Sequence, residues 1–112
     1  MMKNMLSTIS CIQPLRRCFD MSENELADLR SQIDDVDRQM AELFIRRMMV
    51  SGNIAVFKKK AGLNIFDQER EKEKLAAQEM QVPELLRPYY REFLEKCMEL
   101  SKNYQKEVQI EL

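Results

Sequence analysis

Arg47 and Lys58 are two residues whose types and spacing could bind a charged small molecule. They are eleven residues apart, which is about three turns of an α-helix with a residual rotation of only ~20°. Both side chains would therefore project to the same side of a helix, roughly 16 Å apart along its axis. Arg47 also interrupts an apolar stripe, where a charge is unfavourable unless it is paired or meets a ligand. Two cations at this separation could bracket a small dianion.

Two more pairs of polar residues have the spacing of one helical turn. Asp67 and Glu71 are four residues apart, with Arg70 beside them, and Ser101 and Gln105 are also four apart. Residues at this spacing lie on the same face of a helix. Each pair would therefore present its side chains to a common site.

Taken singly, each of these residues has an ordinary structural interpretation. Charged residues on a helix surface are usually solvated, and this would account for Lys58 and Arg70. It would also account for Arg30, which lies beside the same stripe as Arg47. An Asp before a helix is usually a cap, a Glu is usually an i,i+4 partner of a cation, and a helical Ser is usually a tolerated small polar residue. This interpretation is weakest for Arg47 and Gln105, because their stripes are otherwise apolar.

Three helices would have to position these residues. The first spans Ser22–Ala61, with a capping box at its start, Gly62 placed just after its end, and Gly52 inside it. The residues of its stripe, apolar except for Arg47, are alternately three and four apart, which is typical of a long helix with one packed face: Leu26, Leu29, Ile33, Val36, Met40, Leu43, Arg47, Val50, Ile54, Phe57 and Ala61. Asp67 caps a second helix that runs to about Gln81, and Pro83 opens a third.

The predicted fold is all-α, with one very long helix and two shorter ones. A helix of about 40 residues is about 60 Å long, whereas a compact domain of about 90 residues has a radius of gyration near 12 Å. The first helix therefore could not cover its apolar stripe within its own chain. A symmetric homodimer is the commonest way to cover such a stripe.

Composition excludes several classes of function. The net charge of −1 and the lack of a basic run argue against nucleic-acid binding. The chain has no His, which removes His-based triads and most zinc sites, and its three Cys (Cys11, Cys18 and Cys97) lack metal-ligand spacing. We therefore expect no metal site and free thiols in a reducing, cytoplasmic compartment. No apolar run approaches the ~20 residues that span a bilayer.

At 112 residues the chain holds one domain at most. Residues 22–112 form the predicted helical domain. Residues 1–21 are expected to be a leader without function. This leader would be a disordered tail or an over-long start of the sequence before Met21, and a transit-like segment is the alternative.

The chain from about Ser22 to Val108 resembles the all-helical class of chorismate mutases, which are intertwined homodimers of one very long and two shorter helices. Five segments carry the resemblance in register: LRSQID (29–34), LFIRR (43–47), IAVFK (54–58), DQERE (67–71) and SKNYQ (101–105). The resemblance implies conversion of chorismate to prephenate, a Claisen rearrangement on the route to phenylalanine and tyrosine. This intramolecular reaction needs no metal and no cofactor. It depends on holding the substrate in its reactive conformation and on stabilising the charge that grows as the C–O bond breaks.

The resemblance also implies roles for the cations and the amide. Arg47 would bind one carboxylate of chorismate, and Arg30 of the other subunit would bind the second. Lys58 and Gln105 would donate hydrogen bonds to the ether oxygen, where negative charge grows in the transition state. Since Gln is a donor at every pH, whereas relatives with Glu here need it protonated, turnover should depend little on pH.

The remaining site residues follow from the same resemblance. Glu71, with Asp67, would orient the ring hydroxyl, and Ser101 and Arg70 would complete the wall around a carboxylate. The chain departs from the family in lacking the Pro often found shortly before the Asp of the second helix.

Two alternatives share this helical pattern. Isochorismate-pyruvate lyases use a similar cationic pocket, but proteins resembling them tend to lack the acids found here at Asp67 and Glu71. A non-catalytic helical dimerisation or regulatory module would have lost one or more of the polar site positions, and none is lost here.

Overall fold

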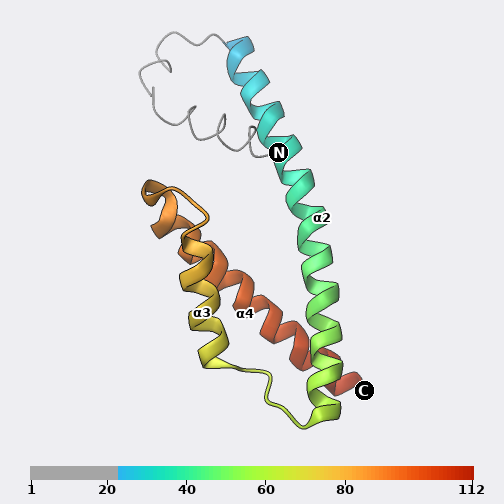
Figure 1. Cartoon of the computed structure of the whole chain (residues 1–112). Coiled ribbons are helices and arrows are strands. Elements are labelled where there is room, and N and C mark those ends of the chain that lie inside the picture. The colour runs from blue at the N-terminus through green and yellow to red at the C-terminus, as the bar shows by residue number, and fades with distance from the viewer. Residues whose placement is uncertain (1–22) are drawn as a thin grey trace. The chain divides into compact units, whose positions relative to one another are not determined.

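The computed structural model describes residues 23–112, which form three α-helices and one short 3-10 helix (Figure 1). The elements are α2 (Glu23–Ala61), α3 (Gln68–Glu79), η2 (Glu84–Leu86) and α4 (Arg87–Glu111). No strand occurs between residues 23 and 112, so the predicted all-α fold with one long helix is confirmed. The expected leader, residues 1–21, and Ser22 of the capping box lie outside the described residues.

Helix α2 is continuous over 39 residues, about 58 Å, and passes through Gly52 without a break. Its first turn carries Glu23 and Glu25 and its last turn is basic, as the helix dipole favours. Gly62 ends the helix with φ 70°, and the amides of Gly62 and Leu63 donate to the carbonyls of Lys59 and Lys58. These two bonds form a Schellman motif, so the predicted role of Gly62 is confirmed.

The chain divides into two compact units, residues 1–41 and 42–112, and the division falls within α2. In the first unit the described part is the Glu23–Ala41 segment of α2, in which every residue is exposed. The apolar side chains of its stripe keep 37% to 60% of their surface exposed. This stripe is therefore uncovered by the described residues.

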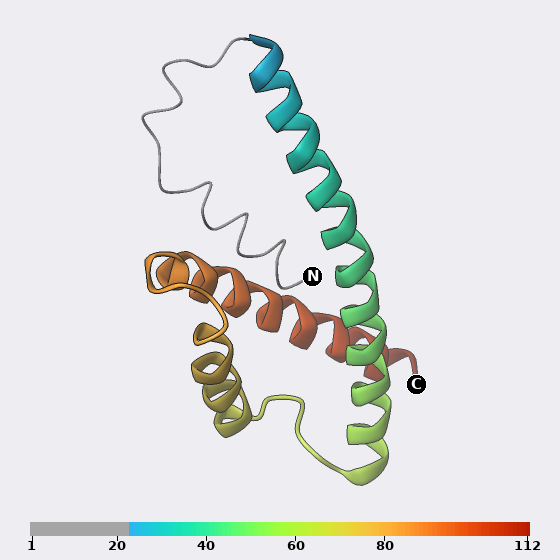
Figure 2. The ribbon, with the colours of Figure 1, turned by 45° about the horizontal axis from the view of Figure 1, so that its top comes forward.

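In the second unit, the last half of α2 contacts α4, and α3 packs on α4. Figures 1 and 2 both show α4 (orange to red) crossing the green half of α2, with α3 (yellow) beside α4. Three contacts follow one another along α2 and α4 at intervals of four residues in both helices: Arg47 with Ser101, Ser51 with Gln105, and Ala55 with Gln109. Because the order is the same in both helices, these segments run in the same direction where they touch. Gly52 permits the close approach, since a Cβ there would lie 3.2 Å from the Tyr104 ring.

The start of the third helix differs from the prediction. Pro83 precedes the 3-10 turn η2, and α4 begins only at Arg87, with Pro88 in its first turn. Pro88 has no amide hydrogen and its ring would clash with the carbonyl four residues earlier, so the α-helix cannot extend back over η2. Arg87 Nε closes the corner by donating to the carbonyls of Glu79 (3.0 Å) and Val82 (3.1 Å).

The interior of the second unit is small and unusually polar. Its buried apolar residues are Ala55, Leu94 and Met98, and an equal number of buried residues are polar: Ser51, Ser101 and Gln105. Polar side chains are buried when they are hydrogen-bonded or serve a site. The three polar residues lie where α2 contacts α4, and that contact borders the pocket described next.

Candidate active site

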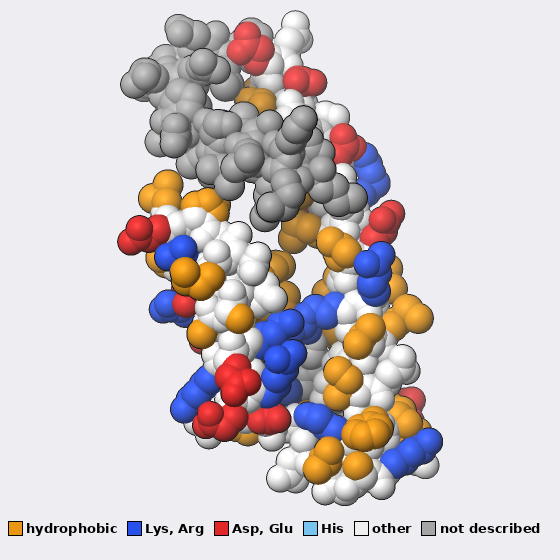
Figure 3. All heavy atoms as spheres, viewed as in Figure 1, with side chains coloured by type: hydrophobic (Ala, Val, Ile, Leu, Met, Phe, Trp, Pro, Cys, Tyr) orange, Lys and Arg blue, Asp and Glu red, His pale blue; other side chains and the backbone are white. Residues whose placement is uncertain are grey.

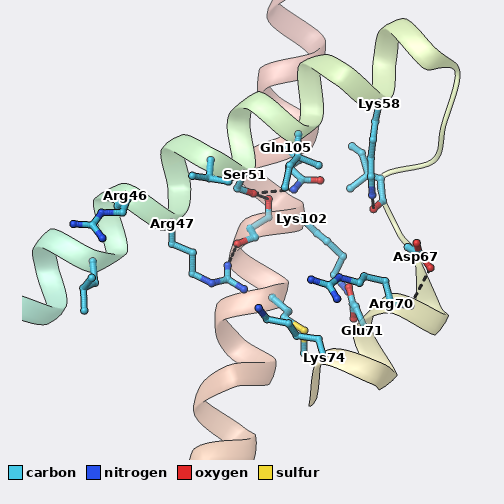
Figure 4. Close-up of a pocket in the computed structure, with 16 residues that line it drawn as sticks. Arg46, Arg47, Ser51, Lys58, Asp67, Arg70, Glu71, Lys74, Lys102 and Gln105 are labelled. Atoms are coloured by element: carbon cyan, nitrogen blue, oxygen red, sulfur yellow. Dashed lines mark hydrogen bonds and ion pairs between the residues drawn. The ribbon is translucent and has the colours of Figure 1, made fainter. Parts of the chain in front are cut away.

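A pocket of about 470 Å³ opens between the last half of α2, the start of α3 and α4 (Figure 4). Seven of the eight predicted site residues line it: Arg47, Lys58, Asp67, Arg70, Glu71, Ser101 and Gln105. The eighth, Arg30, lies on the Glu23–Ala41 part of α2, is exposed, and does not line the pocket. Apolar side chains such as Val50, Ile54 and Met98 form the rest of the wall.

The charge of the pocket is strongly positive. It is lined by the cations Arg46, Arg47, Lys58, Arg70, Lys74 and Lys102 and by the carboxylates of Asp67 and Glu71, a formal charge of +4 in a chain with a net charge of −1. Figure 3 shows Lys and Arg side chains gathered between α3 and the last half of α2. A concave site lined mostly by charges of one sign attracts ligands of the opposite charge.

Arg47 is held by α4 and not by an acid. Its Nη1 donates to Ser101 Oγ and to the Cys97 carbonyl oxygen at 3.4 Å. Among residues 23–112 Arg47 forms no ion pair, although it is half-buried. Its other guanidinium nitrogens can therefore bind a planar anion such as a carboxylate. An Arg47 that served only to neutralise Glu71 would be paired with that carboxylate, which is bound by Lys102 instead.

Lys58 supports the loop between α2 and α3. Its half-buried ammonium donates to the Ile65 carbonyl oxygen at 2.8 Å, which draws the loop against the last turns of α2. An ammonium has three donors, so this bond leaves donors for a ligand. Figure 4 shows the side chains of Lys58 and Gln105 on the same side of the pocket.

Asp67 and Glu71 begin α3. Asp67 is the N-cap of α3, and its Oδ1 accepts from the Arg70 amide at 3.1 Å, which confirms the predicted cap. The carboxylate of Glu71 is paired with Lys102 at 3.0 Å, and both side chains are about one quarter exposed. The Lys102 ammonium also lies 4.6 Å from the centroid of the Phe66 ring. Lys102 thus ties α4 to α3 and to the loop before it.

Gln105 is buried at the contact between α2 and α4. Its Nε2 donates to Ser51 Oγ at 2.8 Å. Ser51 Oγ in turn donates to the carbonyl oxygen of Ser101 at 3.5 Å. The Oε1 atom of Gln105 is buried without a hydrogen-bond partner among the described residues. The amide is therefore only half satisfied by the protein.

The family model for chorismate mutase type II matches residues 29–106. The chain belongs to the chorismate mutase type II family. The match includes all eight predicted site residues, from Arg30 to Gln105, and family membership supports chorismate mutase activity in general. Comparison with curated proteins and with solved structures gave no match.

The described residues show neither a metal site nor a membrane-spanning helix. No group of three or more His, Cys, Asp or Glu side chains in residues 23–112 could hold a metal ion. None of the helices in the same range is long and apolar enough to cross a membrane.

Four polar pocket residues were absent from the sequence-based prediction: Arg46, Ser51, Lys74 and Lys102. Ser51 follows Arg47 by one helical turn, so its position on the same face was an available signal. Lys102 follows Ser101 directly and pairs with Glu71 across 31 residues, which no local spacing predicts. Nothing in the sequence distinguishes Arg46 and Lys74 from ordinary cations on a helix surface.

Proposed function

We propose that this protein is a chorismate mutase that converts chorismate to prephenate by Claisen rearrangement, in phenylalanine and tyrosine biosynthesis in the cytoplasm. The observation that carries the proposal is the pocket with a formal charge of +4, in a chain of the chorismate mutase type II family. The reaction rearranges one molecule, so the protein has to bind a flexible dianion in its reactive conformation and stabilise the transition state. An array of fixed cations and neutral donors suits both tasks.

Arg47 binds one carboxylate of chorismate. Its contacts with Ser101 Oγ and the Cys97 carbonyl orient the guanidinium on α4. A guanidinium held in this way can form two parallel hydrogen bonds to a carboxylate with little further loss of side-chain freedom. Ser101 and Arg70 complete the wall around the carboxylate.

Lys58 and Gln105 donate to the ether oxygen of chorismate. Figure 4 shows both side chains directed to the same side of the pocket, Lys58 from the end of α2 and Gln105 from α4. Negative charge grows on this oxygen as the C–O bond breaks, so donors placed there act most strongly in the transition state. Glu71, with the backbone or side chain of Asp67, orients the ring hydroxyl.

The active enzyme is a homodimer in which Arg30 of the partner chain binds the second carboxylate. The described residues of the chain leave the apolar stripe of Glu23–Ala41 exposed, and Arg30 lies on this segment. Covering such a stripe with a second copy removes apolar surface from water. The same contact would deliver Arg30 to the site of the partner chain.

Turnover of chorismate by the purified protein tests the proposal. We expect loss of chorismate absorbance with formation of prephenate, and loss of this activity in Arg47→Ala. Arg38→Ala is the matched control, because Arg38 is an exposed cation of the same helix that pairs with Asp35 outside the pocket. If the protein instead releases pyruvate when isochorismate is supplied, it is an isochorismate-pyruvate lyase. No turnover of either compound would indicate a non-catalytic helical module.

A further inference from the structure

The side-chain amide of Gln105 has one satisfied end and one unsatisfied end. Gln105 is only 7% exposed, its Nε2 donates to Ser51 Oγ at 2.8 Å, and its Oε1 has no partner among the described residues. Figure 4 shows Oε1 directed into the pocket on the side of Lys58. A buried carbonyl oxygen without a donor is unfavourable, so this orientation of the amide is not strongly preferred.

Ser51 can hold the amide in either orientation. Its side chain is 4% exposed and lies on α2 between Gln105 and the Ser101 carbonyl. A hydroxyl accepts from one group and donates to another, and its hydrogen can rotate to suit the neighbour. When Nε2 faces Ser51, the hydroxyl accepts from it and donates to the Ser101 carbonyl. If the amide turns by 180°, Oε1 takes the place of Nε2 and the hydroxyl donates to it instead.

We infer that Ser51 is a positioning residue that holds the Gln105 amide with Nε2 facing the pocket when the substrate is bound. The inference rests on the proposed function, in which the ether oxygen of chorismate is an acceptor beside Gln105. In the turned amide Nε2 faces this acceptor and donates one N–H to it, while Oε1 accepts from the Ser51 hydroxyl. The turn thereby replaces an unpaired oxygen beside the ligand with a donor. No other side chain is hydrogen-bonded to the Gln105 amide among residues 23–112.

The first test is the steady-state kinetics of Ser51→Ala in the full chain. Donation to the ether oxygen is strongest in the transition state, so kcat should fall about tenfold while KM stays within about twofold. Ser31→Ala is the matched control, because Ser31 is exposed on the same helix and lies outside the pocket. A Ser51→Ala enzyme with unchanged kcat would overturn the inference. Ser51→Cys keeps the volume with a weaker donor and should lie between wild type and Ser51→Ala.

The second test measures the hydrogen bond without relying on turnover. In Gln105→Glu the Ser51 hydroxyl should donate to the introduced carboxylate and lower the pKa of that carboxyl group, because donation favours the charged form. Adding Ser51→Ala should raise this pKa by about one unit, measured by carbon-13 NMR titration. The eight charged groups that line the pocket are the same in both variants, so the difference isolates Ser51. Equal pKa values in the two variants would overturn the inference.

The two tests separate failure of the inference from failure of the proposed function. In Gln105→Glu only the protonated carboxyl can donate to the ether oxygen, so activity should fall as pH rises through its pKa. Adding Ser51→Ala should move this fall to higher pH by the shift seen by NMR, an effect that a purely structural role would not produce. If the wild-type protein leaves chorismate unchanged, the proposed function fails, and the NMR titration still decides whether Ser51 holds the side chain at position 105.

Discussion

Lys58→Ala should lower kcat for chorismate by about 10²- to 10³-fold, because it removes a donor from the growing negative charge on the ether oxygen. The structure also predicts a separate effect on folding. The Lys58 ammonium donates to the Ile65 carbonyl at 2.8 Å and is half-buried. Losing this bond should lower the free energy of unfolding by about 1 kcal/mol. For a domain of this size that corresponds to a fall in melting temperature of about 4–8 °C.

Lys59→Ala is a control matched in charge, position and bond type. The Lys59 ammonium donates to the Gln109 carbonyl at 2.6 Å, so it also ties α2 to another part of the second unit. Lys59 is exposed and does not line the pocket. Its replacement should therefore lower the melting temperature by an amount no larger than that of Lys58→Ala, with kcat within about twofold of wild type.

Both variants would be assayed by chorismate absorbance and by thermal melting monitored by circular dichroism, with size-exclusion chromatography to follow the oligomeric state. We expect Lys58→Ala to keep the oligomeric state of the wild type, since Lys58 lies in the pocket and outside the stripe of Glu23–Ala41. A Lys58→Ala enzyme within tenfold of the wild-type kcat would refute its assignment as an ether-oxygen donor. Equal losses of kcat in Lys58→Ala and Lys59→Ala would show that charge near the end of α2 matters and the donor does not.

Three other predictions follow from the same residues. Turnover by the wild type should vary little between roughly pH 5 and 9, because the Gln105 amide donates at every pH; a steep fall above neutrality, measured under saturating chorismate, would contradict this role. Arg30→Ala and Arg47→Ala should each be inactive alone. An equimolar mixture after subunit exchange should recover about a quarter of wild-type activity, because half of the dimers are mixed and each mixed dimer holds one intact site. If subunits exchange and no activity is recovered, Arg30 serves the site of its own chain. Glu79→Gln should lower the melting temperature at pH 7, because a hydrogen bond from Arg91 holds the pKa of Glu79 below its ordinary value of 4.5. This contribution is present above pH 4.5 and is lost as pH falls through the lower folded pKa, so the difference from wild type should shrink in acid melts; a difference that persists there would have another cause.

Local sequence signals predicted the end of α2 and the start of α3. The Asp67 cap and the Gly62 stop depend on hydrogen bonds and backbone angles within a few residues, so the sequence contains the whole cause. The second helix ends at Glu79, two residues before the predicted end at Gln81, as helix ends fray. The start of the third helix was mistaken because Pro88 acts four residues back along the chain and outweighs the favourable position of Pro83.

Two of the polar residues that line the pocket stood out in the sequence, because a charge or amide on an apolar stripe is rare without a purpose. Arg47 and Gln105 are such residues, and both line the pocket. What each of them contacts was not visible. Arg47 binds α4 through Ser101, while the acid that could have neutralised it, Glu71, pairs with Lys102.

The sequence by itself determined where the helices form and which polar residues interrupt their apolar faces, because both depend on spacing along one helix. Only the tertiary structure decided which side chains meet across helices. The hydrogen bond between Ser51 and Gln105 joins residues 54 apart, and it exists because α2 and α4 run in the same direction at a close contact that Gly52 permits. The angle and register of that contact are set by packing, which involves both helices at once, and so Ser51 acquires its proposed role only in the folded chain.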